Sequence, residues 1–142
     1  MKKILLVVLV LLGCFSFSSF GQQGLEEKIV LYYFHGNARC VSCRNIEKYT
    51  REALEKNFFD EIASGSIDFQ VVNVEEKGNE HYTQDYKLYT KAVVLSRVKS
   101  GQEVEYKNLE QVWQYLYSRE KFSQYIKDET QRFLEEEKGK QI

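Results

Sequence analysis

Two cysteines, Cys40 and Cys43, are the residues of this sequence best able to do chemistry, and two residues separate them. One turn of α-helix would bring their sulfurs close enough to bond. At a helix N-terminus, unpaired N–H groups and a partial positive charge favour the thiolate, which is the nucleophile in thiol–disulfide exchange. Arg39 and Arg44 flank the pair and act in the same direction. We therefore predict that Cys40 is the exposed attacking sulfur and Cys43 the resolving one.

His35 lies five residues before Cys40 and has two interpretations. It could tune the thiolate or carry a proton, or it could be a loop histidine bonded to the backbone. It could also be a third metal ligand, but a structural zinc site usually needs four, and His81 is remote in sequence. The residues leave three alternatives for the cysteine pair: redox chemistry, an inert bridge, or binding of a metal, an arsenic(III) centre or a cluster shared between two chains.

Hydrophobic periodicity predicts the elements that position this pair. The apolar run Ile29–Phe34 indicates a strand buried on both faces, and a helix is predicted from Cys40 to Ala63. The later predictions, in order, are a strand at 67–73, a short helix at 80–89, a strand at 92–95, a turn at 99–102, a strand at 103–107, and a helix at 109–137 broken near Ser118. Strands joined by helices pair in parallel, whereas a tight turn makes an antiparallel pair. The sequence therefore predicts an α/β fold with a central mixed sheet of about four strands flanked by helices.

The N-terminus has the pattern of an export signal. Lys2 and Lys3 precede the aliphatic run Ile4–Leu12, and small residues favour cleavage after Gly21. We therefore expect a signal peptide at 1–21, one domain at 22–142, and a periplasmic protein, in a compartment that permits disulfides. An alternative is a lipoprotein anchored through Cys14, because Leu11–Cys14 resembles a lipobox. Contact with a membrane is expected only in that case.

Composition, net charge and missing motifs exclude several classes of partner and cofactor. The chain has 142 residues, 43% of them hydrophobic, which suits one domain with a core. A formal net charge of -1 gives no electrostatic attraction to nucleic acid, so no such partner is expected. The sequence contains no phosphate-binding glycine motif and no haem-attachment motif, so we expect no cofactor.

The Cys-x-x-Cys pair after an apolar strand, within this order of elements, resembles the thioredoxin superfamily over roughly residues 29–134. More narrowly, Tyr32–Thr50 and Glu105–Glu110 are similar to the ArsF family, whose members are described as subunits of a nitrophenyl-compound nitroreductase system. The resemblance implies a thioredoxin-like fold and an exported thiol-redox or electron-relay protein. Its partner would be a reductase, in a nitroaromatic-reducing system, or a membrane redox protein. Whether the chain is itself a thiol–disulfide oxidoreductase, a nitroreductase accessory subunit or a non-catalytic adaptor stays open.

The sequence departs from ordinary thioredoxins at two places. Val41 and Ser42 stand between the cysteines in place of Gly-Pro, and the chain contains no proline at all. Thioredoxins have a cis-proline facing the cysteines, at a place that falls near Thr90–Ala92 in this chain. Its absence counts against ordinary disulfide reduction and strengthens the alternative of metal or metalloid capture.

Overall fold

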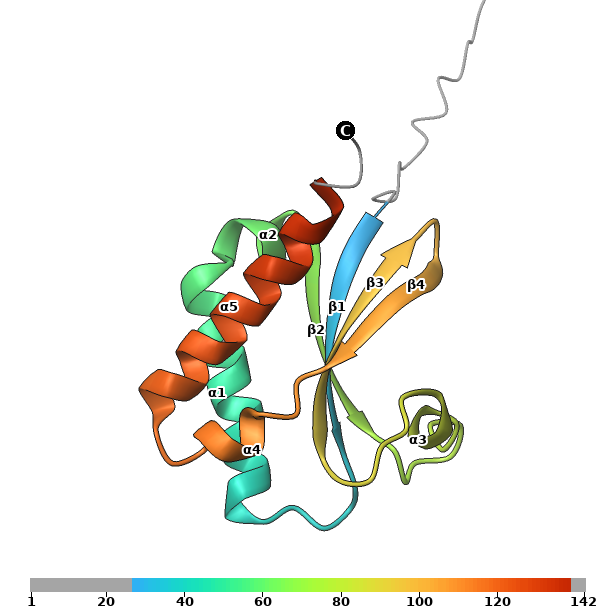
Figure 1. The fold of residues 1–142 in the computed structure, drawn as a ribbon. Helices are drawn as coiled ribbons and strands as arrows, with labels where there is room; N and C mark the ends of the chain where they lie inside the picture. The colour runs from blue at the N-terminus through green and yellow to red at the C-terminus, as the bar shows by residue number, and fades with distance from the viewer. Residues whose placement is uncertain (1–26, 139–142) are drawn as a thin grey trace, which may run out of the picture.

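The computed structural model describes residues 27–138 and builds them around one sheet (Figure 1). The four strands lie in the order β2-β1-β3-β4. They are β1 (Glu27–His35), β2 (Ile67–Asn73), β3 (Ala92–Lys99) and β4 (Gln102–Asn108). β1 pairs in parallel with β2 and antiparallel with β3, which in turn pairs antiparallel with β4. The sheet is therefore mixed, as the sequence predicts.

The helices cover the two faces of this sheet unequally. They are α1 (Val41–Asn57), α2 (Phe59–Ala63), α3 (Tyr82–Asp85), α4 (Val112–Tyr115) and α5 (Arg119–Lys138). Figure 1 shows α1, α2, α4 and α5 on one side of the sheet and only α3 on the other. Because a sheet alternates its side chains between faces, odd-numbered residues of β1 meet the long helices and even-numbered residues meet the α3 side.

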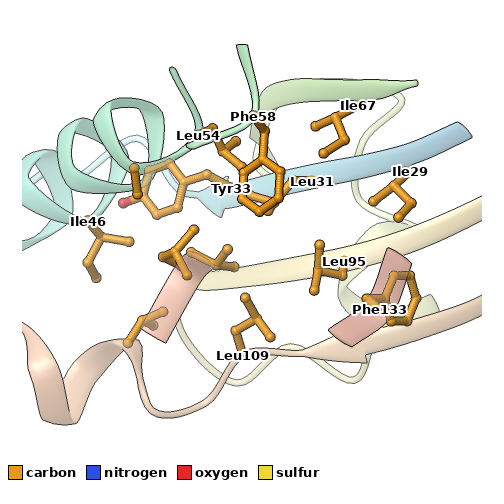
Figure 2. Packing of buried hydrophobic residues seen from close by; sticks show 14 of the residues in the cluster. Ile29, Leu31, Tyr33, Ile46, Leu54, Phe58, Ile67, Leu95, Leu109 and Phe133 are labelled. Carbon is orange, nitrogen blue, oxygen red and sulfur yellow. The ribbon is translucent and has the colours of Figure 1, made fainter. Parts of the chain in front are cut away.

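The main core lies between the sheet and the two long helices, α1 and α5. Figure 2 shows Leu31 and Tyr33 of β1 beside Leu54 of α1, with Leu95 and Phe133 on the far side of the cluster. A smaller cluster lies under α3, where the ring of Phe34 packs against Tyr82 and Tyr86 with ring centroids 5.2 Å apart in each pair. The two clusters together hold β1 at the centre of the fold.

Two predicted helices differ from the structure. The helix predicted at 40–63 ends at Asn57, and Phe58 (φ −136°) separates α1 from α2. Phe58 is 1% exposed, so the backbone leaves the helical course where this ring enters the core. The helix predicted at 80–89 is reduced to α3, because Lys87 adopts a left-handed backbone (φ 51°). The same turn leaves Tyr89 exposed, away from Tyr86, although a continuous helix would put both on one face.

Two other local predictions are confirmed. The break near Ser118 separates α4 from α5, and the Ser118 hydroxyl accepts a hydrogen bond from the Lys121 N–H at 3.3 Å, as a helix cap does. The predicted turn joins β3 to β4, and both central residues, Ser100 and Gly101, have positive φ angles of 50° and 79°. Such a turn matches the twist of a two-residue hairpin.

Within residues 27–138, none of the helices combines the length and the apolar character that crossing a bilayer requires. The predicted signal peptide and Cys14 fall outside that range.

Candidate thiol redox site

The two cysteines lie at the start of α1, directly after the loop that connects β1 to this helix. After His35 the chain forms a short loop, and Cys40 (φ −75°, ψ 174°) is the N-cap residue of α1. Its Sγ accepts a hydrogen bond from the Cys43 backbone N–H at 3.3 Å. Cys40 is exposed, whereas Cys43 is 1% exposed, and their Sγ atoms lie 2.6 Å apart. The predicted placement, one exposed and one buried sulfur at a helix start, is what the structure shows.

The surroundings of Cys40 favour its thiolate. A hydrogen bond with the Cys43 side chain is the largest cause that lowers the pKa of the Cys40 thiol, and backbone hydrogen bonds from Cys43 and Ser42 act in the same direction. These N–H groups belong to the first turn of α1, where no earlier helical carbonyl is available to accept from them. The exposed sulfur is therefore the more reactive of the two by position and by charge.

A cluster of three side chains lies behind the buried sulfur. Tyr33 is fully buried, and its hydroxyl donates a hydrogen bond to the Cys43 carbonyl at 2.7 Å. Burial raises the pKa of Tyr33, and the charge of a Cys43 thiolate raises it further. The Arg39 guanidinium lies 6.0 Å from the centre of the Tyr33 ring and forms an ion pair with Glu47. Tyr33 and Arg39 thus link Cys43 to a carboxylate on the next turn of α1.

The Arg39–Glu47 pair fixes the charge of both groups. Burial alone would raise the pKa of the Glu47 carboxyl, but hydrogen bonds and charge from Arg39, and then from Arg51, bring it below its ordinary value. Glu47 was not identified from the sequence. Its signal would have been its spacing, because Glu47 lies four residues after Cys43 and so on the same side of α1.

The predicted tuning residues differ in what they contact. The described partners of the Arg39 side chain are Glu47 and Tyr33. Arg44 is exposed, and its backbone N–H, 3.1 Å from the Cys40 carbonyl, belongs to the helix. His35 is the last residue of β1 rather than a loop residue, and its Nδ1 lies 2.9 Å from the Gly36 carbonyl, which matches the interpretation of a backbone-bonded histidine. An effect of these three residues on the thiols stays a prediction.

The loop that carries the cysteines is fastened to the end of β2. The Asn37 backbone N–H donates to Glu75 Oε2 at 3.0 Å, and its side-chain Oδ1 accepts from Asn73 Nδ2 at 2.8 Å. Glu75 belongs to the charged segment Glu75–Lys77, for which the sequence predicts a solvated turn. It is exposed, yet it is a structural part of the site. A single acidic residue after a strand carries no pattern that could have revealed this contact.

The segment that faces the loop is fixed without a proline. Phe34 pairs with Ala92, so the start of β3 lies beside the end of β1. The Trp113 indole donates to the Lys91 carbonyl at 3.0 Å, and no cis peptide bond occurs in the described part of the chain. Trp113 is half-buried and packs against the main core. Its hydrogen bond thus holds the backbone near Thr90–Ala92, where thioredoxins have a cis-proline and this sequence has none.

Metal ligands are not gathered around the thiols. Across residues 27–138, no three His, Cys, Asp or Glu side chains come together in a group that could hold a metal ion. His35 therefore does not complete a three-ligand set with Cys40 and Cys43. A metal or metalloid bound at this site would therefore be held by the two sulfurs alone or by ligands from another molecule as well.

A Cys-x-x-Cys pair at the start of the helix that follows β1, on a sheet ordered β2-β1-β3-β4, defines a thioredoxin-like fold. No family model matches the chain. No curated protein matches it either. Solved structures that resemble it include thioredoxin from Fasciola hepatica, with 22% identity, a TM-score of 0.38, and coverage of 69% of this chain and 81% of that one.

Two further similar structures are also thioredoxins. Thioredoxin O2 from Arabidopsis thaliana, in its oxidised state, has 19% identity and a TM-score of 0.37, over 64% of this chain and 76% of that one. Thioredoxin f2 from Chlamydomonas reinhardtii has 11% identity and a TM-score of 0.40, over 67% of this chain and 83% of that one. The strand order and connections given above carry the assignment of the fold.

Proposed function

We propose that this protein is a thiol–disulfide redox protein that works through Cys40 and Cys43. The observation that carries the proposal is the arrangement of the two sulfurs. One is exposed and has a lowered pKa, the other is buried, and 2.6 Å separates them at the start of α1. A disulfide, with a bond of about 2.05 Å, would need only a small movement of these atoms.

The reaction moves two electrons between two pairs of sulfurs. The Cys40 thiolate attacks one sulfur of a substrate disulfide, and the other substrate sulfur leaves as a thiolate that takes up a proton. The Cys43 thiol then loses its proton, and its sulfur attacks Cys40 Sγ, releasing the second substrate thiolate. The substrate disulfide is reduced and the cysteine pair is oxidised. A dithiol partner restores the pair by the same steps, and the reverse sequence would oxidise a substrate instead.

Titration of the free thiols in glutathione or dithiothreitol redox buffers tests this function. We expect a two-electron transition between dithiol and disulfide within the range of known thiol redox proteins, which extends from roughly −270 to −120 mV. Cys43→Ser should accumulate a mixed disulfide through Cys40, whereas Cys40→Ser should form none. A pair that stays in one state throughout the titration, or equal trapping by both variants, would sink the proposal.

We further propose where the protein acts in the cell and which kind of system it serves. The signal-like N-terminus supports an exported, periplasmic protein, and the similarity of Tyr32–Thr50 to the ArsF family supports service to a nitroaromatic-reducing system. Fractionation of cells, with mass determination of the mature N-terminus, distinguishes cleavage after Gly21 from lipidation at Cys14. The trapped Cys43→Ser disulfide identifies the partner. A partner that is neither a reductase nor a membrane redox protein would contradict this role.

A second candidate function is capture of arsenic(III) by the two thiolates. It is favoured by the close approach of the two sulfurs together with the absence of proline from the chain. Arsenite added to the reduced protein should then protect both thiols from alkylation in a one-to-one complex, and Cys43→Ser should lose this protection. Unchanged alkylation at excess arsenite removes this candidate.

If the Cys40→Ser, Cys43→Ser double variant still supports the partner's activity, the protein is an adaptor instead.

A further inference from the structure

The two edges of the sheet differ in how they are protected against pairing with another strand. β4, at one edge, carries Glu103 and Glu105, and it has a bulge at Val104, because Arg97 pairs with Glu105 and Val98 with Glu103. Charges and bulges are the usual devices that keep an edge from pairing. β2, at the other edge, has neither a bulge nor a proline, and its only charged residue is Asp68. Among the strands of residues 27–138, the contrast marks β2 as the edge that is open to pairing.

The backbone of β2 presents regularly spaced hydrogen-bonding groups on this free side. The Ile29 N–H donates to the Ser66 carbonyl and the Val74 N–H to the His35 carbonyl, both at 2.8 Å, so even-numbered residues of this segment point their backbone toward β1. Since alternate residues point to opposite sides, Ile67, Phe69 and Val71 point their N–H and C=O groups outward. No strand in the described part of the chain lies on that side of β2.

We propose that this edge pairs with the same edge of a second copy of the chain, antiparallel and with Phe69 opposite Phe69 on a two-fold axis. In this register Ile67 of each copy faces Val71 of the other, so all the outward groups of these residues find partners. Moving the two-fold axis by one residue toward the C-terminus would instead require the Asn73 carbonyl, which already accepts bonds from the Glu76 N–H and the Asn79 side chain. Moving it toward the N-terminus would require the Gly65 N–H, which already donates to the Ile62 carbonyl. The free groups of β2 therefore select this register.

The charges along the edge suit a second copy. In the proposed register each Asp68 faces Gln70 of the other copy and never the other Asp68. The Gln70 side chain now donates to Asp68 of its own strand at 2.7 Å and is placed to donate across the interface instead. Arg51 and Glu55 of α1 line a cavity of about 390 Å³ beside β2, and Phe69 lies under the Arg51 guanidinium at 4.9 Å. In the proposed dimer, each copy therefore brings a positive charge (Arg51) and a negative charge (Glu55) to the border of the interface.

Such a pair would leave the redox site accessible. Because the two β2 strands run in opposite directions, the C-terminal ends of the two β1 strands point to opposite ends of a continuous sheet. Each Cys40 therefore stays exposed. The inference is independent of the proposed redox function, since dimerisation can be measured on the fully reduced protein.

Sedimentation equilibrium of the purified, reduced protein over a range of concentrations tests this inference, with Gln70→Glu and Gln70→Lys as a matched pair. We expect a concentration-dependent dimer. Gln70→Glu places two like-charged pairs in the interface and should raise the dimer Kd roughly two- to thirty-fold, whereas Gln70→Lys should lower it by a similar factor. The controls Gln102→Glu and Gln102→Lys, on the β4 edge, should leave the Kd unchanged.

Amide hydrogen exchange of the unaltered protein is a second test that needs no variant. The amides of Ile67, Phe69 and Val71 should become more protected as the concentration rises. A monomer at every concentration overturns the proposal, and so does the same change of Kd from Gln70→Glu and Gln70→Lys. An equal response to the Gln102 variants, or exchange at these three amides that does not depend on concentration, overturns it as well.

Discussion

At the scale of single residues, the reactivity of the site comes from several weak effects on one sulfur. The N-cap position gives the Cys40 Sγ the Cys43 N–H, and the Cys43 thiol supplies the largest contribution that lowers its pKa. Because folding lowers this pKa, ionisation of Cys40 favours the folded state. That stabilisation is fully present above the ordinary thiol pKa and is lost as the pH falls through the lowered value.

Replacing the hydrogen-bonding partner of Cys40 should therefore change its pH profile. Cys43→Ala removes the thiol that donates to Cys40, so the pKa of Cys40 should rise toward that of a free cysteine. Cys43→Ser keeps a hydroxyl donor and should raise it less. The rate of alkylation of Cys40 as a function of pH measures both values, and the far-ultraviolet absorbance of the thiolate checks them. If both variants keep the Cys40 pKa of the unaltered protein, the backbone N–H groups alone set it.

Glu47→Gln tests the ion pair behind the buried sulfur. The change removes the carboxylate that holds Arg39, so we expect a loss of about 0.5–1 kcal/mol in unfolding free energy, as for a partly exposed pair. Folding lowers the pKa of Glu47, so the pair stabilises the protein above the ordinary carboxyl pKa and ceases to do so in acid. The variant and the parent should therefore converge in stability at low pH, as measured by urea unfolding. A difference that persists undiminished in acid would assign the loss to packing.

At the scale of the elements, the sequence predicts those parts that repeat a local pattern. The apolar run of β1, the helix start at Cys40 and the turn at Ser100–Gly101 follow from periodicity and turn chemistry. The break at Phe58 does not, because its cause is the burial of one ring among residues distant in sequence. Glu75 was missed for the same reason, because it acts through a contact that only the folded chain creates. Glu47 was missed although its spacing from Cys43 was a signal in the sequence.

Gly36→Ala tests the attachment of the cysteine loop to the end of β2. A Cβ at this position would collide with Glu75 Oε1, so the carboxylate must move away and release the Asn37 N–H. We expect a loss of about 1 kcal/mol, the usual value of one hydrogen bond, and faster exchange of the Asn37 amide. Glu75→Ala should have the same effect.

The double variant makes this test specific. If Gly36→Ala acts only by displacing Glu75, adding it to Glu75→Ala should cost nothing further, which gives a large coupling in a double-mutant cycle. Urea unfolding of the four proteins measures the coupling. Losses that simply add would mean that residue 36 acts through another contact.

At the scale of the whole molecule, Arg97 joins elements that are far apart in sequence. It is 4% exposed on β3, and its guanidinium lies 2.6 Å from a Glu27 carboxylate oxygen on β1 and 3.4 Å from one on Glu105 of β4. It also donates to the Phe133 carbonyl on α5 and lies 4.6 Å from the centre of that ring. Arg97 pairs with Ile29, near the start of β1, whereas the cysteines follow the end of that strand. Stability and redox chemistry are therefore separated along β1.

Substitution of Arg97 should accordingly weaken the fold and leave the thiol chemistry unchanged. Arg97→Ala removes the stem that packs on Phe133 as well as the charge, and we expect a loss of roughly 2–4 kcal/mol in urea unfolding. Arg97→Met keeps apolar volume over the ring. The carboxylates of Glu27 and Glu105 are 30% and 38% exposed, so water can hydrate them when the guanidinium is gone. Arg97→Met should therefore lower the free energy of unfolding by only about 1 kcal/mol. The redox titration of Cys40 and Cys43 should be the same in both variants. Equal losses from Met and Ala would mean that the charge, and not the packing of the stem, attaches α5 to the sheet.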